Sequence, residues 1–297
     1  MIKFQTYRLR HFAFPLLLAI LLIIAISTFL YGIIVHLNIQ SIPDWLMQII
    51  IPCILGGIAI QRVYPRLLNR FEFRLPSYFS TLPKLVLYLL MMGMSLVVIH
   101  YSAKSIRYNF GKTLYVKSVN DLQPHEQPYF LEMGDWYADR LRVIPLNTYE
   151  MTGLFTKKVQ LRSLFVMPVF SRNTAYRTKA KAWLAVDYKK IVSETEFKSN
   201  QGRDFYEESL SHFRKINVRE YLYLEQYPNN KFYRIYLNLV QTHSYFQSGY
   251  AYIYKGQNIH RDTLSLYYAT VTSVILLLAC FPVSLLISLL FQPLKEK

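Results

Sequence analysis

The sequence predicts a membrane protein with four transmembrane α-helices and one extracytoplasmic α+β domain whose sheet is mainly antiparallel. The first observation behind this prediction is composition: 53% of the 297 residues are hydrophobic and 18% are charged. A soluble domain is about 45–50% apolar and about 25% charged. The second observation is that the apolar residues are gathered in four blocks, and the third is a strand-rich segment before the last block. This composition excludes a disordered chain, and two cysteines are too few for a disulfide-rich scaffold.

Each of the four apolar blocks is expected to form a membrane helix, which needs about 20 apolar residues. Three helices are expected at 12–37, 44–61 and 84–103, within an amino-terminal membrane region of residues 1–103. The segment 264–297 supplies the fourth helix and a short cytoplasmic tail. A buried core hairpin is the alternative for the short second block. The first block is too long for a secretory signal peptide and lacks a cleavage site, which indicates an uncleaved anchor.

The orientation follows from the short basic flanks, because Lys and Arg next to membrane helices stay in the cytoplasm. The amino-terminal tail carries Lys3, Arg8 and Arg10, whereas the turn at residues 38–44 carries no basic residue. This pattern puts both termini in the cytoplasm and residues 104–263 outside it. The chain has no N-x-[ST] sequence, which favours a bacterial inner membrane and a periplasmic domain over a eukaryotic secretory membrane.

Four arginines at a spacing of four residues follow the second apolar block. They lie on one face of an expected interfacial helix over 62–75, because residues four apart share a helix face. We expect them to bind the phosphates of anionic lipids; a simple topology signal or a docking surface for a cytoplasmic partner are the alternatives. The four residues are Arg62, Arg66, Arg70 and Arg74.

The segment 104–263 has the size of a single domain and shows mainly strand periodicity. Period-two alternation predicts a strand over 178–188, paired with a strand over 159–170 through a turn at 171–174. Two helices are expected at 203–216 and 128–140. Further strands are expected at 113–119, 141–145, 220–226, 232–241 and 250–254.

Motifs for catalysis are absent from the sequence, which carries no nucleophile elbow, phosphate-binding loop or H-E-x-x-H zinc signature. A group of carboxylates between residues 121 and 139 could pair with His125 or His212 for acid–base chemistry. A solvated loop and helix is the favoured interpretation of that group, and no cofactor is expected. The carboxylates are Asp121, Glu126, Glu132, Asp135 and Asp139.

Two sets of side chains in the outer domain are candidates for contact with a partner. The basic strand face formed by Arg177, Lys179 and Lys181 and ending in Trp183 could bind an acidic partner. An alternating row of tyrosines could offer a rigid recognition surface. A solvated face and an inward tyrosine layer are the respective alternatives. The tyrosines of that row are Tyr250, Tyr252 and Tyr254.

Three histidines are expected at the level of the outer membrane interface: His36, His100 and His260. Such a cluster could ligate a metal or a haem, although polar rings also suit the interface belt without any ligand. The latter interpretation is favoured.

The function predicted from these features is recognition of a protein or an envelope component by the outer domain, as an assembly subunit, a sensor or an immunity protein. A membrane-bound enzyme acting at the outer leaflet and a subunit of an oligomeric transporter or secretion complex are the alternatives. Anionic lipids and a protein partner outside the cytoplasm are the expected contacts, with oligomerisation possible. Nucleic acid is not expected, because the domain lies outside the cytoplasm.

Overall fold

A computed structural model of the chain divides into two compact units. The helical unit comprises Met1–Gly111 and Arg261–Lys297, and the sheet unit comprises Lys112–His260. The structure describes residues 6–7, 9–39, 42–68, 71–73, 82–124, 127–152, 158–172, 179–198, 202–250, 252–280, 282, 284 and 291–293.

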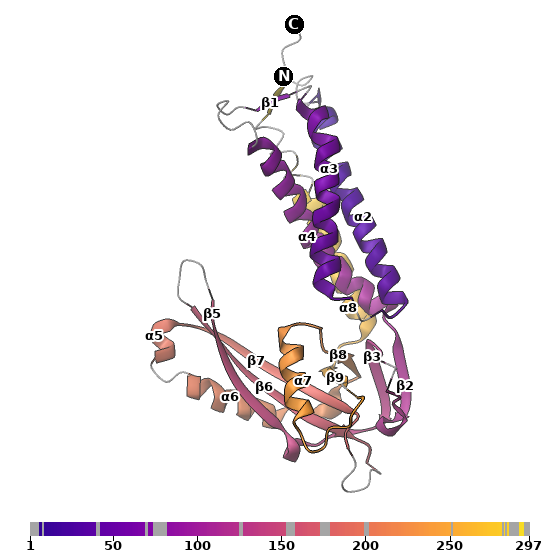
Figure 1. Cartoon of the computed structure of the whole chain (residues 1–297), viewed down its shortest axis with the longest axis vertical. Coiled ribbons are helices and arrows are strands. Elements are labelled where there is room, and N and C mark those ends of the chain that lie inside the picture. The colour runs from indigo at the N-terminus through magenta and orange to yellow at the C-terminus, as the bar shows by residue number, and fades with distance from the viewer. Residues whose placement is uncertain are drawn as a thin grey trace. The chain divides into compact units, whose positions relative to one another are not determined.

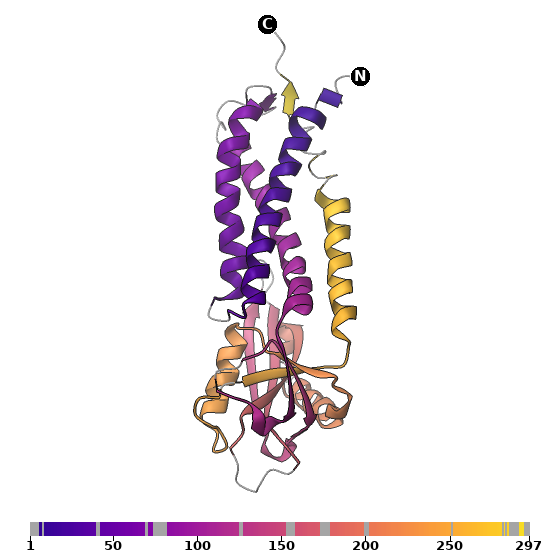
Figure 2. The ribbon, with the colours of Figure 1, turned by 90° about the vertical axis from the view of Figure 1, so that its right-hand side faces the viewer.

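Four long helices make up most of the helical unit, and they lie side by side (Figure 2). Three begin or end in a π-helical turn: Leu9–Ala13 leads into α2, Leu46–Ile50 leads into α3, and Leu276–Cys280 ends α8. A short antiparallel ribbon pairs β1 (Phe71–Phe73) with β10 (Phe291–Pro293). The helices are α2 (Phe14–His36), α3 (Ile51–Leu68), α4 (Leu82–Phe110) and α8 (Arg261–Ile275).

Three of these helices are long and apolar enough to cross a membrane, namely Leu9–His36, Leu46–Pro65 and Lys84–Phe110. Large apolar side chains also cover their outward faces; the side chain of Phe29, for example, is 69% exposed. Lipid would cover such faces at no cost, because acyl chains are as apolar as these side chains. The prediction of three amino-terminal helices that are apolar enough to span a membrane is therefore confirmed. Helical structure after Arg261 is described as far as Cys280, and a fourth span stays a prediction.

The arginines after the second span do not begin a separate helix. Helix α3 continues without a break to Leu68, with Pro65 inside it, so Arg62 and Arg66 belong to its last turns. Residues Phe71–Phe73 form β1 instead of continuing as a helix. A single helix over 62–75 is therefore wrong at residues 71–73, and Arg62 and Arg66 extend α3 because Pro65 costs one N–H bond without ending the helix. Arg70 and Arg74 lie outside the described residues, and phosphate binding by the four arginines stays a prediction.

A glycine brings α3 and α4 into close contact. A Cβ atom placed on Gly56 would lie 2.4 Å from the sulfur of Met92 in α4. Near it, the Tyr88 hydroxyl donates a hydrogen bond of 3.3 Å to the carbonyl of Cys53. Small residues let membrane helices approach in this way, so that backbone and side chains pack closely.

Charged side chains tie the helix ends together where α4 finishes. The Arg261 guanidinium donates to the carbonyls of Tyr108 and Gly111, at 2.7 Å and 3.3 Å. The last carbonyls of a helix have no partner within it, so a cation there both satisfies them and opposes the helix dipole. Arg107 of α4 also lies 3.9 Å from the carboxylate of Asp44, which precedes α3.

The sheet unit is built on a curled, mixed eight-stranded sheet (Figure 1). The strand order is β2-β3-β8-β9-β7-β6-β4, and β5 also pairs with β6. The β2–β3 and β7–β9 pairs are parallel and the others are antiparallel. The strands are β2 (Thr113–Ser118), β3 (Phe130–Asp135), β4 (Tyr137–Ala138), β5 (Ile144–Thr152), β6 (Lys158–Phe170), β7 (Ala182–Ser193), β8 (Tyr223–Gln226) and β9 (Tyr252–Gln257).

Two helices cover opposite faces of this sheet (Figure 1). Helix α6 (Gly202–Lys215) packs Phe213 onto the ring of Phe165, with the ring centroids 4.6 Å apart. Helix α7 (Lys231–Gln241) buries Tyr236 and Val240 against the other face. Short helical turns lie at α5 (Glu194–Glu196), Val119–Asp121, Arg140–Arg142 and Val218–Glu220.

For two of the expected elements, the structure has a helix where a strand was expected or strands where a helix was expected. Residues 232–241, expected as a strand, belong to helix α7, because the side chain of Asn230 accepts hydrogen bonds from the N–H groups of Phe232 and Tyr233 and caps the helix. Residues 128–140, expected as a helix, form β3 and β4. Strand β3 is flanked by β2 and β8, and its side chains Phe130 and Leu131 are both fully buried, so the period-two signal of a half-exposed strand is missing.

The long hairpin of β6 and β7 and the helix α6 are where the sequence predicts them. Strand β7 nevertheless begins at Ala182, so the alternation from residue 178 extends too far. Pro168 lies in the interior of β6, opposite Trp183 of β7. It is tolerated there because the turn Arg140–Arg142 interrupts the pairing beside it. The Asp139 carbonyl accepts from the Arg142 N–H instead, so no N–H is required at position 168.

Candidate functional site

The basic strand face that the sequence suggests is largely a structural feature. The Lys181 ammonium donates to the carbonyl of Leu122 at 2.8 Å and to that of Asn120, and it lies 5.0 Å from the centre of the Tyr250 ring. Lys179 is exposed, and Arg177 lies outside the described residues. Trp183 is fully buried, because α7 covers the face on which it lies.

The row of tyrosines faces inward. Tyr250, Tyr252 and Tyr254 are all buried in the core beneath α6, and the Tyr252 hydroxyl donates to the carbonyl of Gln123 (2.5 Å). Burial raises the pKa of Tyr254 well above its usual value, and the neighbouring Tyr252 adds to this. These rings are therefore packing residues, as in the alternative interpretation of the pattern.

The three histidines lie in different parts of the chain. His36 ends α2, and His100 lies in α4 with its Nδ1 atom 3.3 Å from the side-chain oxygen of Gln48. His260 is the last residue of the sheet unit. Within the part of the chain that is described, no three His, Cys, Asp or Glu residues gather as a metal site.

Three of the carboxylates that an enzyme could use, Asp121, Asp135 and Asp139, have local structural roles. Asp121 accepts from the N–H of Ser118 in a capping box, and Asp139 caps the next turn and pairs with Arg142 at 3.2 Å. Asp135 accepts from the Ser171 hydroxyl and from the N–H of Arg172. His125 and Glu126 lie outside the described residues.

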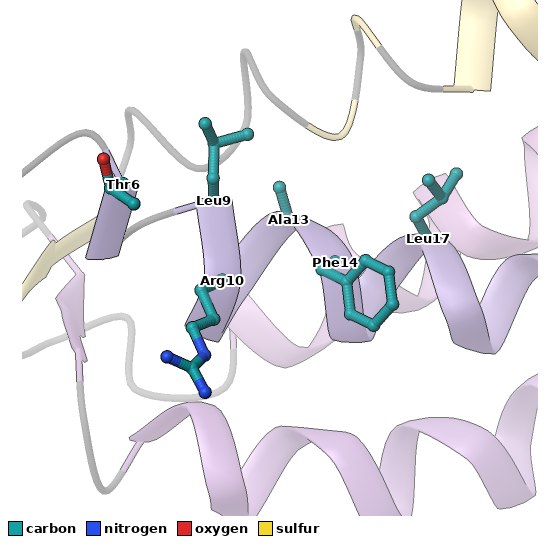
Figure 3. Close-up of a pocket in the computed structure, with 6 residues that line it drawn as sticks. All are labelled: Thr6, Leu9, Arg10, Ala13, Phe14 and Leu17. Carbon is teal, nitrogen blue, oxygen red and sulfur yellow. The ribbon is translucent and has the colours of Figure 1, made fainter.

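A hollow of about 380 Å³ lies along the start of the first helix (Figure 3). Leu9, Ala13 and Leu17 point to one side of the helix, while the Arg10 guanidinium points to another. The lining is almost entirely apolar and includes one cation. Such a surface suits contact with lipid, and it offers no set of groups for catalysis.

Strand β5 presents a different kind of surface, because none of the described strands pairs with one of its edges. Its nine residues pair with β6 in unbroken register, from Ile144 opposite Val166 to Thr152 opposite Lys158. No other described strand pairs with β5. A free edge exposes a row of N–H and C=O groups that can bond another chain.

Beside this edge lies an apolar patch, which we call the β5 patch and define as Tyr149, Met151 and Phe197. Tyr149 and Met151 are 62% and 65% exposed. The Tyr149 ring lies 5.1 Å from that of Phe197. Beside the patch, on the same face of the sheet, the cross-strand neighbours Leu161 and Val159 are buried, and Phe197 packs against them. The patch therefore borders a packed cluster.

The opposite face of β5 is held to the start of α7 by charged groups. Glu150 forms an ion pair with Lys231 of that helix. Arg162, on the neighbouring strand, lies 3.7 Å from the centre of the Phe232 ring and 3.3 Å from the carboxylate of Asp187. These contacts join β5 and β6 to the start of α7 on this face.

Sequence reasoning placed a strand only at 141–145 and missed this edge. A period-two signal was present only over residues 148–151, where the polar Thr148 and Glu150 alternate with the apolar Tyr149 and Met151. Comparison of the chain with protein families, with curated proteins and with solved structures finds no match.

Proposed function

We propose that this chain is an inner-membrane protein whose extracytoplasmic domain recognises a protein of the cell envelope. In this proposal the chain crosses the membrane four times, both termini are cytoplasmic and the domain is periplasmic. The three apolar helices support membrane anchoring, and the basic flanks support the orientation.

The observation that carries the proposal is the β5 patch at an unpaired strand edge. Apolar side chains that are exposed together with free backbone groups are typical of sites that bind other proteins. Aromatic and methionine side chains are enriched at such interfaces.

Photo-crosslinking in native membranes tests this function. A photoreactive phenylalanine analogue replaces Tyr149 in one full-length variant and Tyr115 in a matched control. Tyr115 is also exposed, at 71%, but lies on β2. We expect a discrete adduct from position 149 and none from position 115. The same adducts from both positions, or none from either, would contradict the proposal.

The captured protein must then bind in purified form. The full chain in lipid nanodiscs is titrated with it, alongside a Tyr149→Ser, Met151→Ser variant and a Tyr115→Ser control. Loss of a few well-packed apolar side chains weakens an interface by about 2 kcal/mol or more, which corresponds to about thirtyfold in Kd. Equal affinities for the three chains would refute a role for the patch.

A further inference from the structure

The free edge of β5 also indicates how a partner binds, and this step rests on the proposed function. We propose that the partner contributes an extended segment that adds to the sheet as a further strand beside β5. Its backbone would bond the outer edge of β5, and its side chains would lie beside the β5 patch. In such strand addition, backbone bonds supply affinity and alternate side chains supply specificity.

The first reason is that β5 carries few of the features that normally protect an edge. Proteins block edge strands with charged residues, especially lysine, with proline, with bulges, or by keeping the strand short. Strand β5 has nine residues, no lysine and an unbroken register with β6, and its one proline, Pro145, lies near its start. Its one charged residue, Glu150, is paired with Lys231 on the face that α7 covers. The opposite edge strand, β2, has six residues and carries the exposed Lys117.

The second reason is the direction of the backbone groups along β5, which the neighbouring strand decides. The Pro168 carbonyl of β6 accepts from the Asp139 N–H at 2.9 Å, so the backbone of Pro168 is directed toward the β4 and β5 side. Every second residue of a strand has the same direction, so Val166, Leu164 and the even-numbered residues before them bond β5. Their partners are the even-numbered residues of β5.

The odd-numbered residues of β5 therefore direct their N–H and C=O groups outward. They include Pro145, which has no N–H and fits only where no ladder bond is required. Beyond it, Asn147, Tyr149 and Met151 offer alternating donors and acceptors along the edge. These are the groups that an added strand would bond.

The third reason is the chemistry of the two faces beside this edge. In the second half of β5, one face exposes the apolar side chains of Tyr149 and Met151, and the polar Asn147 is exposed before them on the same face. On the other face, Thr148 and the Glu150–Lys231 ion pair are polar. An added strand would match both faces if its residues alternated between apolar and polar. The partner is therefore expected to be an extended segment with apolar side chains at every second position.

A proline substitution separates backbone recognition from side-chain contact. Asn147→Pro removes an outward N–H and leaves the bonds to β6 intact, whereas Asn147→Ala removes only the side chain. Both variants carry the photoreactive group at position 151, in the full chain and in native membranes. We expect Asn147→Pro to reduce the yield of the adduct about tenfold and Asn147→Ala to change it less than twofold.

Hydrogen exchange of the full chain checks that Asn147→Pro preserves the fold. The even-numbered amides of β5 should stay protected in the variant as in the parent chain. An undiminished adduct from a folded Asn147→Pro variant would overturn strand addition while leaving the recognition function standing. Absence of any adduct in the parent chain would instead refute the proposed function. An adduct with twice the mass of the chain would show that the added strand comes from a second copy of this chain and would refute recognition of a different protein.

Discussion

The aromatic ring of Tyr221 lies directly against the backbone of Gly256 in β9. A Cβ atom placed on Gly256 would lie 2.2 Å from two ring carbons of Tyr221. Leu222, next to this ring, donates its N–H to the carbonyl of Gln257 at 2.8 Å. The glycine thus lets the ring cover the strand, and no side chain fits in its place.

Gly256→Val should destabilise the sheet unit by about 1–3 kcal/mol, because an added side chain in a packed site forces its neighbours to shift. The measurement is resistance of the full chain in nanodiscs to proteolysis during heating. Gly134→Ala is the matched control, since a Cβ atom there would meet only the Lys117 carbonyl at 3.5 Å. Equal thermal shifts of the two variants would refute the close contact.

Lys181→Met should destabilise the sheet unit by about 1–3 kcal/mol, because the carbonyls of Leu122 and Asn120 would lose a charged donor. Lys179→Met, which changes an exposed residue on the same segment, should have an effect of less than about 0.5 kcal/mol. Chemical denaturation of the full chain in nanodiscs measures both. If Lys179→Met destabilised the sheet unit more than Lys181→Met does, the structural role assigned to Lys181 would be refuted.

The stability of the sheet unit should fall as the pH falls below about 6.5, because of His243. Burial lowers the pKa of His243 below the ordinary value of 6.5, and Arg142 lowers it further. The ring lies 5.2 Å from that of Trp183, and its Nδ1 atom accepts from the Tyr245 N–H. The unfolded chain then binds a proton on His243 more readily than the folded chain does. The contribution of His243 to the free energy of unfolding is therefore complete above pH 6.5 and decreases as the pH falls below that value.

Thermal unfolding between pH 7.5 and pH 5.5 measures this dependence. His243→Phe should flatten it, whereas His212→Gln should not, because His212 is exposed on α6. If the His243→Phe variant kept the full pH dependence, another group would have to be responsible.

Gly56→Leu should separate α3 from α4, because its side chain would occupy the position of Met92. Gly57→Leu is the matched control, since no atom lies within 4 Å of a Cβ atom placed there. A cysteine pair linking the two helices measures the effect. We expect crosslinking to fall severalfold for position 56 only; equal yields would contradict close packing at Gly56.

The sequence by itself determined the elements whose pattern is long and regular. The apolar blocks at the amino terminus predicted three helices capable of spanning a membrane, because their composition alone excludes water. Helix α6 was also predictable, since it buries one face at the helical period. Strand β6 was predictable as a long apolar run, most of which is buried on both faces.

Only the tertiary structure decided which faces of the sheet are covered by helices. This coverage explains why one expected strand is a helix and why one candidate binding residue is buried. Residues 232–241 could satisfy their apolar pattern as a strand or as a helix until a sheet face was available for α7 to cover. The same helix buries Trp183 and removes it from any binding surface. The exposed edge of β5 likewise depends on the order of the strands in the sheet. That order is set by pairing between residues that are distant in sequence, which determines whether a strand has one neighbour or two.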